Sequence, residues 1–367
     1  MLSLLYWPVV ALGLAMGAGT LLSFSRHPHW FVRGWDFPRP LIAGLALLSG
    51  STYGLVFQNG QWWDWGFLGI IGLCVGWQSY RIYPYTPAAA TPVKTADRVE
   101  SASRFRLVAS NVQRDNNQHE RWLEVIRRAD PDVILAVEVD EDWAQVLDTL
   151  RDDYPHFVRQ PQDNFYGMML LSRLELIDPQ VRFIVQDDVP SIHTEVVLES
   201  GQRIDFRGVH PRPPEPINGQ HATARDAEVV LLGREIDERT AHQPTVVAGD
   251  FNDVAWSYTT DLFVQISGLL DPRQGRGLYN TFHAERPWFR FPLDHVFHSN
   301  DFRLVDLRVL EYVGSDHFPV CVDLSYEPAA SGDQPEPEAS AEEEAVAEEK
   351  VAHAAQQEEN GELNGSE

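Results

Sequence analysis

The sequence has little cysteine and little positive charge. Its two cysteines, Cys74 and Cys321, lie far apart, and neither has a CxxC partner. A disulfide scaffold and a cysteine-rich zinc site are therefore excluded, and we expect two buried, inert thiols. Lysine and arginine number 29 against 54 aspartates and glutamates, so the formal net charge is −25. A field of that sign opposes long polyanions unless arginines cluster locally.

Charge is also sparse in the first 85 residues, which contain three uncharged apolar runs. We predict transmembrane helices at about 2–24, 41–57 and 62–82, because the first run as a helix reaches about 35 Å, enough for a hydrocarbon core of about 30 Å. For that run a cleaved signal peptide is the alternative, but its basic residues follow the run instead of preceding it. For the set, the alternative is three buried helices of a soluble domain.

Three spans place the loop 25–39 and all residues after 85 on one side of the membrane. That loop carries Arg26, Arg33 and Arg39 against Asp36, whereas the second loop has no basic residue. We therefore predict a multi-pass protein of the inner or plasma membrane, and the positive-inside bias places its C-terminal part in the cytoplasm.

Two segments lack the composition of a folded domain. Residues 86–103 begin with prolines and alanines, which is typical of an extended linker. Residues 328–367 carry twelve acidic residues against the single Lys350, which predicts a disordered acidic tail. Residues 104–327 between them should form the folded domain.

Strand and helix patterns alternate through residues 104–327. We expect helices at 119–129, 141–151, 222–240 and 258–266. We expect strands at 106–111, 132–139, 165–172, 181–186, 194–198, 204–209, 245–248, 294–297, 302–310 and 319–324. Helices mixed with runs of adjacent strands predict an α/β sandwich and not a regular parallel barrel.

The strand at 245–248 runs into Gly249-Asp250-Phe251-Asn252, so a buried strand delivers a carboxylate and an amide on a rigid support. A plain turn is the other interpretation, because Gly-Asp-x-Asn is also good turn chemistry. Polar residues end or open several other predicted strands, namely Asn111, Glu138, His210, Asp294, Asp316 and His317. Each alone is more often a loop acid or a structural histidine, but their order along the chain is hard to produce by accident.

These segments resemble the endonuclease/exonuclease/phosphatase superfamily of metal-dependent phosphoesterases, which has the fold of deoxyribonuclease I. The resemblance runs from about Arg104 to Tyr326 and is most specific in Gly249–Asn252 and in Ser315-Asp316-His317-Phe318-Pro319. It implies a four-layered α/β sandwich, in which two mixed β-sheets are flanked by helices, after the N-terminal bundle of about three transmembrane helices.

The resemblance also implies a role for each residue. Asn111, Glu138 and Asp316 would hold Mg²⁺, or Mn²⁺ in its place. Asp250 would orient or deprotonate the attacking water, and Asn252 would hold a phosphoryl oxygen. His317, fixed by Asp294, would polarise the phosphate, and His210 would be a general acid for the leaving group. Two positions depart from the family pattern, Gln113 where several nucleases have an acid and Val137 where a glutamine is common.

The substrate is left more open. Residues 271–292 form a candidate recognition loop with Trp288 and Arg290 as substrate-binding candidates, and an aromatic-anchored surface loop is the alternative. The only candidate cluster of positive charge beside the site is Arg273, Arg276, Arg286 and Arg290. A nuclease-like enzyme acting on nucleic acid or nucleotide is our first hypothesis. A hydrolase of phospholipid or another membrane-associated phosphoester is the second, and a catalytically silent membrane scaffold is the third.

Overall fold

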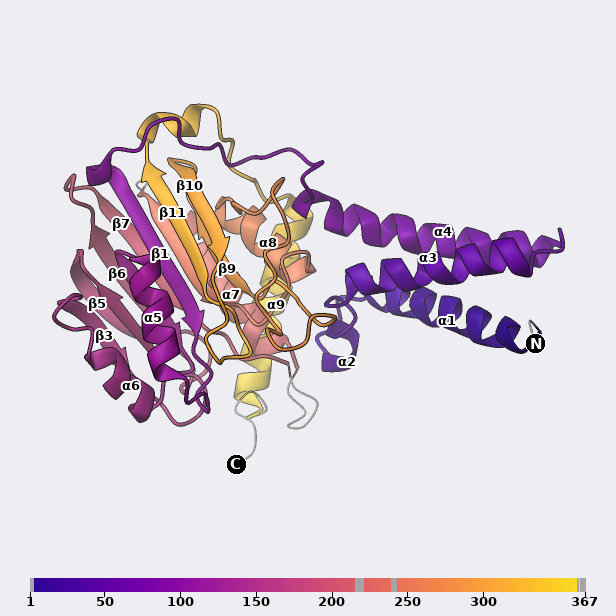
Figure 1. The fold of residues 1–367 in the computed structure, drawn as a ribbon, viewed down its shortest axis with the longest axis horizontal. Helices are drawn as coiled ribbons and strands as arrows, with labels where there is room; N and C mark the ends of the chain where they lie inside the picture. The colour runs from indigo at the N-terminus through magenta and orange to yellow at the C-terminus, as the bar shows by residue number, and fades with distance from the viewer. Residues whose placement is uncertain (1–2, 215–220, 239–242, 362, 364–367) are drawn as a thin grey trace.

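The structure is a computed structural model that describes residues 3–214, 221–238, 243–361 and 363. It consists of an α/β domain from which three long helices project as a stalk (Figure 1). The helices of the stalk are α1 (Ser3–Leu22), α3 (Arg39–Val56) and α4 (Trp62–Ile82), with the short α2 (Trp30–Arg33) at the domain end.

Two β-sheets form the centre of the domain. The first has the order β10-β11-β1-β2-β4-β3, and the second has the order β5-β6-β7-β8-β9. The strands of the first sheet are β1 (Arg104–Asn111), β2 (Val133–Val137), β3 (His156–Gln160), β4 (Met168–Ser172), β10 (Phe302–Val309) and β11 (Val320–Tyr326). Those of the second are β5 (Glu175–Phe183), β6 (Pro190–Val197), β7 (Arg203–Val209), β8 (Thr245–Asp250) and β9 (Asp294–His298). β1 pairs with β2 in parallel, as β7 does with β8, so both sheets are mixed.

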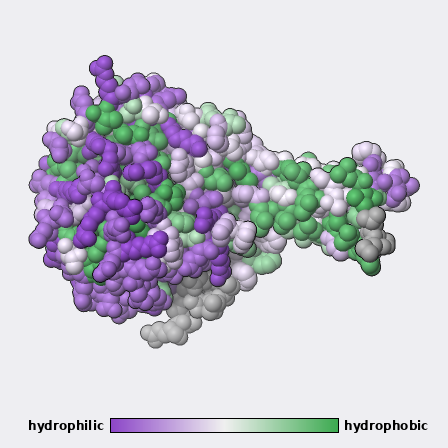
Figure 2. All heavy atoms as spheres, viewed as in Figure 1, coloured by the Kyte–Doolittle hydropathy of each residue, from purple (hydrophilic) through white to green (hydrophobic). Residues whose placement is uncertain are grey.

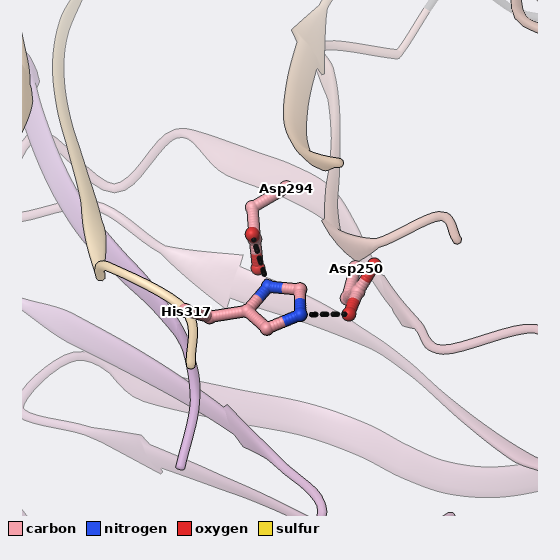
Figure 3. Close-up of side chains that lie close together, drawn as sticks. All are labelled: Asp250, Asp294 and His317. Carbon is pink, nitrogen blue, oxygen red and sulfur yellow. Dashed lines mark hydrogen bonds and ion pairs between the residues drawn. The ribbon is translucent and has the colours of Figure 1, made fainter. Parts of the chain in front are cut away.

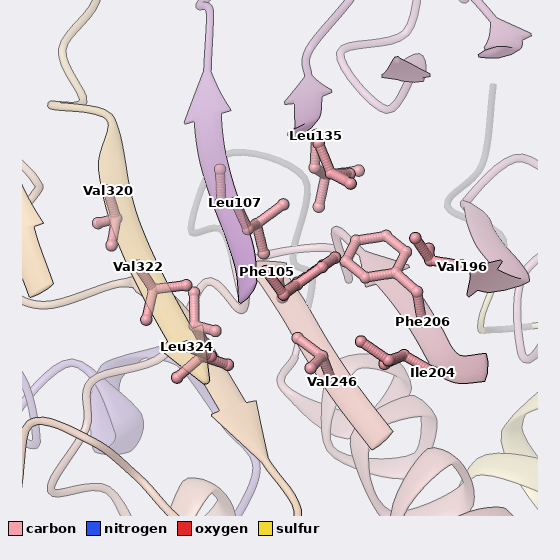
Figure 4. Close-up of a cluster of buried hydrophobic side chains, with 14 of the residues drawn as sticks. Phe105, Leu107, Leu135, Val196, Ile204, Phe206, Val246, Val320, Val322 and Leu324 are labelled. Carbon is pink, nitrogen blue, oxygen red and sulfur yellow. The ribbon is translucent and has the colours of Figure 1, made fainter. Parts of the chain in front are cut away.

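The sheets pack face to face through alternate residues of their strands (Figure 4). Phe105 and Leu107 of β1 point into the space between the sheets, where they meet Phe206 and Val246 of the second sheet. Val108, one residue further along β1, packs instead with the helices outside the first sheet. This alternation is the side-chain period of two that a strand imposes, and it creates one core on each side of β1.

Helices cover both outer faces. α5 (His119–Ala129) and α6 (Glu141–Asp148) cover the first sheet through Trp122 and Trp143. α7 (Thr223–Asp237) and α8 (Tyr258–Ser267) cover the second through Val229 and Phe263. The predicted α/β sandwich of two mixed sheets flanked by helices is therefore confirmed, with β3 as the strand that the sequence missed. β3 is partly exposed along its whole length, so it lacks the alternating pattern that identifies a strand.

The predicted membrane bundle is supported for one helix only. Within the described residues, Leu4–Leu22 is the one stretch long and apolar enough to span a bilayer. α3 and α4 form as expected but fall short of that measure, because their Gly, Ser and Trp residues and terminal charges lower the mean hydropathy. All three helices nonetheless expose large apolar side chains, such as Leu5, Leu55 and Leu73, and Figure 2 shows this apolar surface on the stalk.

The linker and the tail both differ from the sequence prediction. Tyr85, the residue before the linker, is buried and donates from its hydroxyl to the Ala255 carbonyl at 2.6 Å. Val93 is fully buried in the core between the sheets. The linker is thus docked on the domain over part of its length, because two large apolar side chains find partners there.

The tail is not simply disordered, because α9 (Ala341–Glu359) lies against α7 and α8. Ser340 and Glu343 form a capping box at its start. Val346 and Ala347 are buried with Val230 of α7. The sequence prediction missed this short apolar face, because the average composition of the segment is polar and acidic. An ion pair between Lys350 and Asp226 of α7 also holds α9 on the domain.

Candidate active site

The motif Gly249–Asn252 is both the end of a strand and a turn. Gly249 has φ 144°, and a Cβ there would lie 1.9 Å from the Val209 carbonyl oxygen, so only glycine lets β8 continue beside β7. Asp250 follows on β8 and is 1% exposed. Its Oδ1 accepts from the backbone N–H of Asn252 at 2.9 Å. The two interpretations of the motif are therefore compatible, because the turn positions the carboxylate.

His317 lies between two buried carboxylates (Figure 3). Its Nδ1 donates to Asp294 Oδ2 at 2.7 Å, and its Nε2 lies 3.5 Å from Asp250 Oδ2. Burial alone would lower the pKa of His317, but the negative charges of Asp294 and Asp250 outweigh it and raise the pKa to about 10. At neutral pH the side chain is therefore an imidazolium with both protons facing carboxylates.

The potential ligand atoms of Asp250, Asp294 and His317 lie within 4.8 Å of one another, close enough to hold a metal ion. A histidine that binds a metal ion must, however, be neutral, with a free lone pair on the nitrogen that faces the ion. To serve as such a ligand His317 would have to release a proton, and its hydrogen bond to Asp294 keeps one proton on Nδ1.

A second group of oxygen atoms begins at the ends of β1 and β2. Asn111 Nδ2 donates to Glu138 Oε1 at 2.8 Å and also to Asp250 Oδ2 at 3.1 Å. Glu138 has φ 61°, a left-handed conformation that ends β2 and turns its side chain toward Asn111. Burial raises the pKa of Glu138 to about 7, although the hydrogen bond from Asn111 and the charge of His317 oppose that shift, and among the described residues Glu138 forms no salt bridge. A carboxylate in that situation fits a divalent cation, which would supply the missing positive charge.

The segment 314–317 is tied to β1 by two residues that the sequence did not single out for this role. Ser315 Oγ donates to the Asn111 carbonyl at 2.8 Å and accepts from the His317 N–H at 3.0 Å. Gln113 Oε1 accepts from the Asp316 N–H at 2.9 Å. Asp316, half-buried, is thereby held beside Asn111. The sequence offered no signal for these contacts, since they join residues about 200 positions apart.

His210 directly follows β7, and its Nε2 lies 3.9 Å from Asp250 Oδ2, the same oxygen that His317 approaches. Burial lowers the pKa of His210 to about 4, although Asp250 opposes that shift. Its Nδ1 has no hydrogen-bond partner among the described residues. His210 is therefore neutral, in contrast to His317, a difference that the sequence did not predict.

Asn252 is positioned from two directions. Its Nδ2 donates to the Pro211 carbonyl at 2.9 Å, and its own carbonyl accepts from Arg225 Nη1 at 2.8 Å. Arg225 is fully buried in α7 and also pairs with Asp226 and Asp253. Arg225 could not be singled out from the sequence, because an arginine inside a predicted helix is usually a solvated residue.

The base of the recognition loop (271–292) contacts the site, whereas the tip of the loop does not. The ring of Phe282 lies 4.9 Å from that of His317, and the Ala284 N–H donates to the Asp316 carbonyl at 2.7 Å. Arg290 donates to the Ala284 carbonyl and lies over the ring of Phe318, at the rim of the site. Trp288 is 82% exposed, so it is not part of the buried cluster.

The expected arginine cluster is only half present. Arg273 is buried against Asp271 and His295, and Arg276 donates to the Val93 carbonyl in the linker. Both serve the fold. Of the four arginines, Arg286 and Arg290 are left on the loop beside the site.

Comparison with known proteins identifies the group to which this site belongs. The Endonuclease/Exonuclease/phosphatase family model matches residues 106–317, which include every predicted metal and catalytic position. The chain belongs to this family. It is accordingly a metal-dependent phosphoester hydrolase, and the family's dependence on a divalent metal agrees with the oxygen-rich group around Glu138.

Solved structures share the fold at low sequence identity. A humanized D. rerio TDP2 with 14 mutations has 15% identity and a TM-score of 0.51, covering 61% of this chain and 99% of that one. D. rerio TDP2 complexed with single-strand DNA product has 16% identity and a TM-score of 0.50 over the same shares. An endonuclease/exonuclease/phosphatase from Bacteroides vulgatus has 18% identity and a TM-score of 0.50, covering 61% and 99%. No curated protein matches the chain.

Proposed function

We propose that this protein is a membrane-anchored, Mg²⁺-dependent phosphoesterase in which water attacks phosphorus directly. One observation carries the proposal. Oδ2 of Asp250 lies near the imidazolium of His317 and also accepts from Asn111, which in turn donates to the carboxylate of Glu138. Asp250 can thus act as a base beside both the positive charge of His317, which would face the phosphoryl group, and the carboxylate of Glu138, which could bind a cation.

Glu138, Asn111 and Asp316 are the residues that we assign to the metal. They offer the carboxylate and amide oxygens that Mg²⁺ prefers, and Glu138 has the raised pKa of a carboxylate without a paired cation. When bound, the ion would neutralise charge on the phosphoryl oxygens. Mn²⁺ takes similar ligands and is the alternative ion.

Asp250 is the proposed general base. Burial raises its pKa above the usual range of an aspartate, which makes it a better proton acceptor than an exposed carboxylate. It accepts a proton from water, the water oxygen forms a bond to phosphorus, and the ester oxygen leaves with the electrons of the broken P–O bond. The His317 imidazolium, held by Asp294, and the Asn252 amide stabilise the negative phosphoryl oxygens.

His210 takes a different role from the one that the family resemblance implies. With a pKa of about 4 it holds no extra proton to give to a leaving group at neutral pH. We assign it instead as a neutral hydrogen-bond donor that orients a phosphoryl oxygen beside Asp250.

The stalk is the proposed membrane anchor, in which α3 and α4 span the bilayer together with α1. A soluble domain rarely exposes as much apolar surface as these helices carry. Trp7 and Trp62 are 72% and 79% exposed toward the tip of the stalk, as expected of residues at a bilayer interface. α1 packs closely on its neighbours, since a Cβ at Gly13 would lie 2.6 Å from Phe67 and Ser49. That packing favours a retained helix over a cleaved signal peptide.

An assay with a simple soluble ester tests the proposed function. We expect the full chain in detergent to hydrolyse bis-p-nitrophenyl phosphate with Mg²⁺ and to lose this activity with EDTA. Glu138→Ala or Asp250→Asn should reduce turnover by about 100-fold or more, and Asp294→Asn by about 10–100-fold. The control is Asp152→Asn, a change at an exposed residue.

Undiminished hydrolysis by a Glu138→Ala, His317→Ala double variant would overturn the site. An inactive wild type, with all variants alike, would leave the silent scaffold as the function.

A further inference from the structure

Residues 283–290, here called the aromatic loop, carry an apolar tip that the catalytic domain does not cover. Trp288 and Phe289 are 82% and 51% exposed, and Trp288 is the most exposed large apolar residue of the described part of the domain. Burying such side chains in a partner would recover apolar contact that the domain itself does not provide.

The base of the loop is joined to the catalytic residues. Phe282 packs on the ring of His317, and Ala284 is hydrogen-bonded to Asp316. Arg290, at the other side of the loop, lies over Phe318, the residue after His317. Whatever the tip contacts is therefore brought close to the mouth of the site.

The loop is also joined to the foot of the stalk. The ring of Phe291 lies 5.9 Å from that of Phe37, which directly precedes the turn into α3. Phe291 belongs to one buried cluster with Tyr85, which follows α4, and Trp256, whose Nε1 donates to the Asp36 carbonyl at 2.8 Å. The aromatic loop and the ends of α3 and α4 are thus fixed to one another, at the level where those helices would enter a bilayer (Figure 1).

The composition of the loop suits a lipid headgroup layer. Trp and Arg are favoured at that depth, because each combines an apolar body with a polar or charged end. Arg286 is exposed and forms no ion pair with a described residue, so it is available for a phosphate. The positive charge of Arg286 and Arg290 is confined to this loop, because the domain as a whole is acidic. Residues 99–327 contain 22 basic and 39 acidic residues, a net of −17.

We propose that the aromatic loop inserts into the bilayer that holds the stalk, and that the enzyme hydrolyses a phosphoester of a phospholipid in that bilayer. This inference rests on the proposed phosphoesterase and names its substrate class. A nucleic acid would approach a domain of net charge −17 from solution, whereas a lipid reaches the site by lateral diffusion and needs only the local arginines.

Insertion is tested without reference to activity. Full-length protein carrying Trp288→Cys is labelled with an environment-sensitive dye in phosphatidylcholine/phosphatidylglycerol nanodiscs. The wild type, whose two thiols are buried, gives the labelling background. We expect a blue-shifted emission that nitroxide-labelled lipid quenches. The matched control is Phe183→Cys, which is 43% exposed in β5 on the side of the domain away from the stalk (Figure 1). Equal emission and quenching at both positions would overturn the insertion.

The substrate is tested by comparing two activities of the same preparation. We expect wild-type protein to release phosphate or a phosphorylated headgroup from nanodisc lipid. Phe289→Glu should lower the ratio of lipid hydrolysis to bis-p-nitrophenyl phosphate hydrolysis by about tenfold or more.

The two proposals fail in different ways. Hydrolysis of bis-p-nitrophenyl phosphate and plasmid DNA or RNA, without hydrolysis of lipid, would overturn the lipid substrate and leave the phosphoesterase intact. No hydrolysis of any ester would overturn the phosphoesterase, while the dye would still report where the loop lies.

Discussion

Two histidines within reach of one aspartate carry different charges, and their surroundings explain why. His317 has Asp294 on its second nitrogen, so its pKa rises to about 10. His210 has no partner on its Nδ1 among the described residues, so burial dominates and its pKa falls to about 4. One residue type thus supplies both a positive charge and a neutral donor near Oδ2 of Asp250.

A third buried titratable group, Glu228 in α7, gives the stability a pH dependence. It is 2% exposed, its Oε1 has no hydrogen-bond partner among the described residues, and burial raises its pKa to about 8. The folded protein keeps this proton, whereas the unfolded chain releases it near pH 4.5. The stability contributed by Glu228 is therefore present below pH 4.5 and is lost as the pH rises to about 8.

We expect Glu228→Gln to raise the thermal midpoint more at pH 8 than at pH 5, because the amide needs no proton to remain neutral. Thermal unfolding monitored at both pH values measures the difference. Glu238→Gln is the control, at an exposed position after the same helix. A Glu228→Gln effect of the same size at both pH values would contradict the assignment.

At the scale of elements, the C-terminal helix α9 is part of the folded domain. Ala347 is fully buried against α7 and α8, whereas Ala345, two residues earlier, is exposed. The helix is otherwise polar and acidic, so its position depends on a narrow apolar face.

Ala347→Asp should therefore lower the thermal midpoint by about 5–10 °C, from a cost of several kcal/mol for a buried charge. Ala345→Asp makes the same chemical change on the solvent side and should shift the midpoint by less than about 2 °C. Differential scanning fluorimetry of the two variants decides the matter. Equal midpoints would mean that α9 is detached from the domain in solution.

At the scale of the whole molecule, the loop 25–38 and the catalytic domain lie at the same end of the stalk. Arg33 in that loop and Arg39, the first residue of α3, are buried and share the single carboxylate of Asp36, so one negative charge stands against these two positive charges. Arg26 in turn pairs with Glu342 of α9. The charge bias that orients the protein is therefore weaker than the sequence suggests, but it keeps the same sign.

We expect a green fluorescent protein fused after the C-terminus to fluoresce and an alkaline phosphatase at the same point to be inactive, as for a cytoplasmic catalytic domain. Both fusions in the loop 58–61 should give the opposite result. An active phosphatase at the C-terminus would place the domain outside the cytoplasm, and the lipid substrate would then lie in the outer leaflet.

The class of the fold and the candidate residues of the site could both be predicted from the sequence. Both depend on neighbouring residues in the chain, because a short apolar run indicates a buried strand and the candidate site residue directly follows that run. The family motifs at Asp250 and His317 could be recognised for that reason.

Features that depend on long-range contacts could not be predicted in this way. The sequence could not show that Asp250 is shared by Asn111 and His317, that Arg225 supports Asn252, or that Phe282 packs on His317. It also could not show that an acidic tail would fold against α7, or that the recognition loop would be fixed to the foot of the stalk. Each of these depends on burial between segments distant in the chain, and burial sets both the packing and the charge of the groups involved.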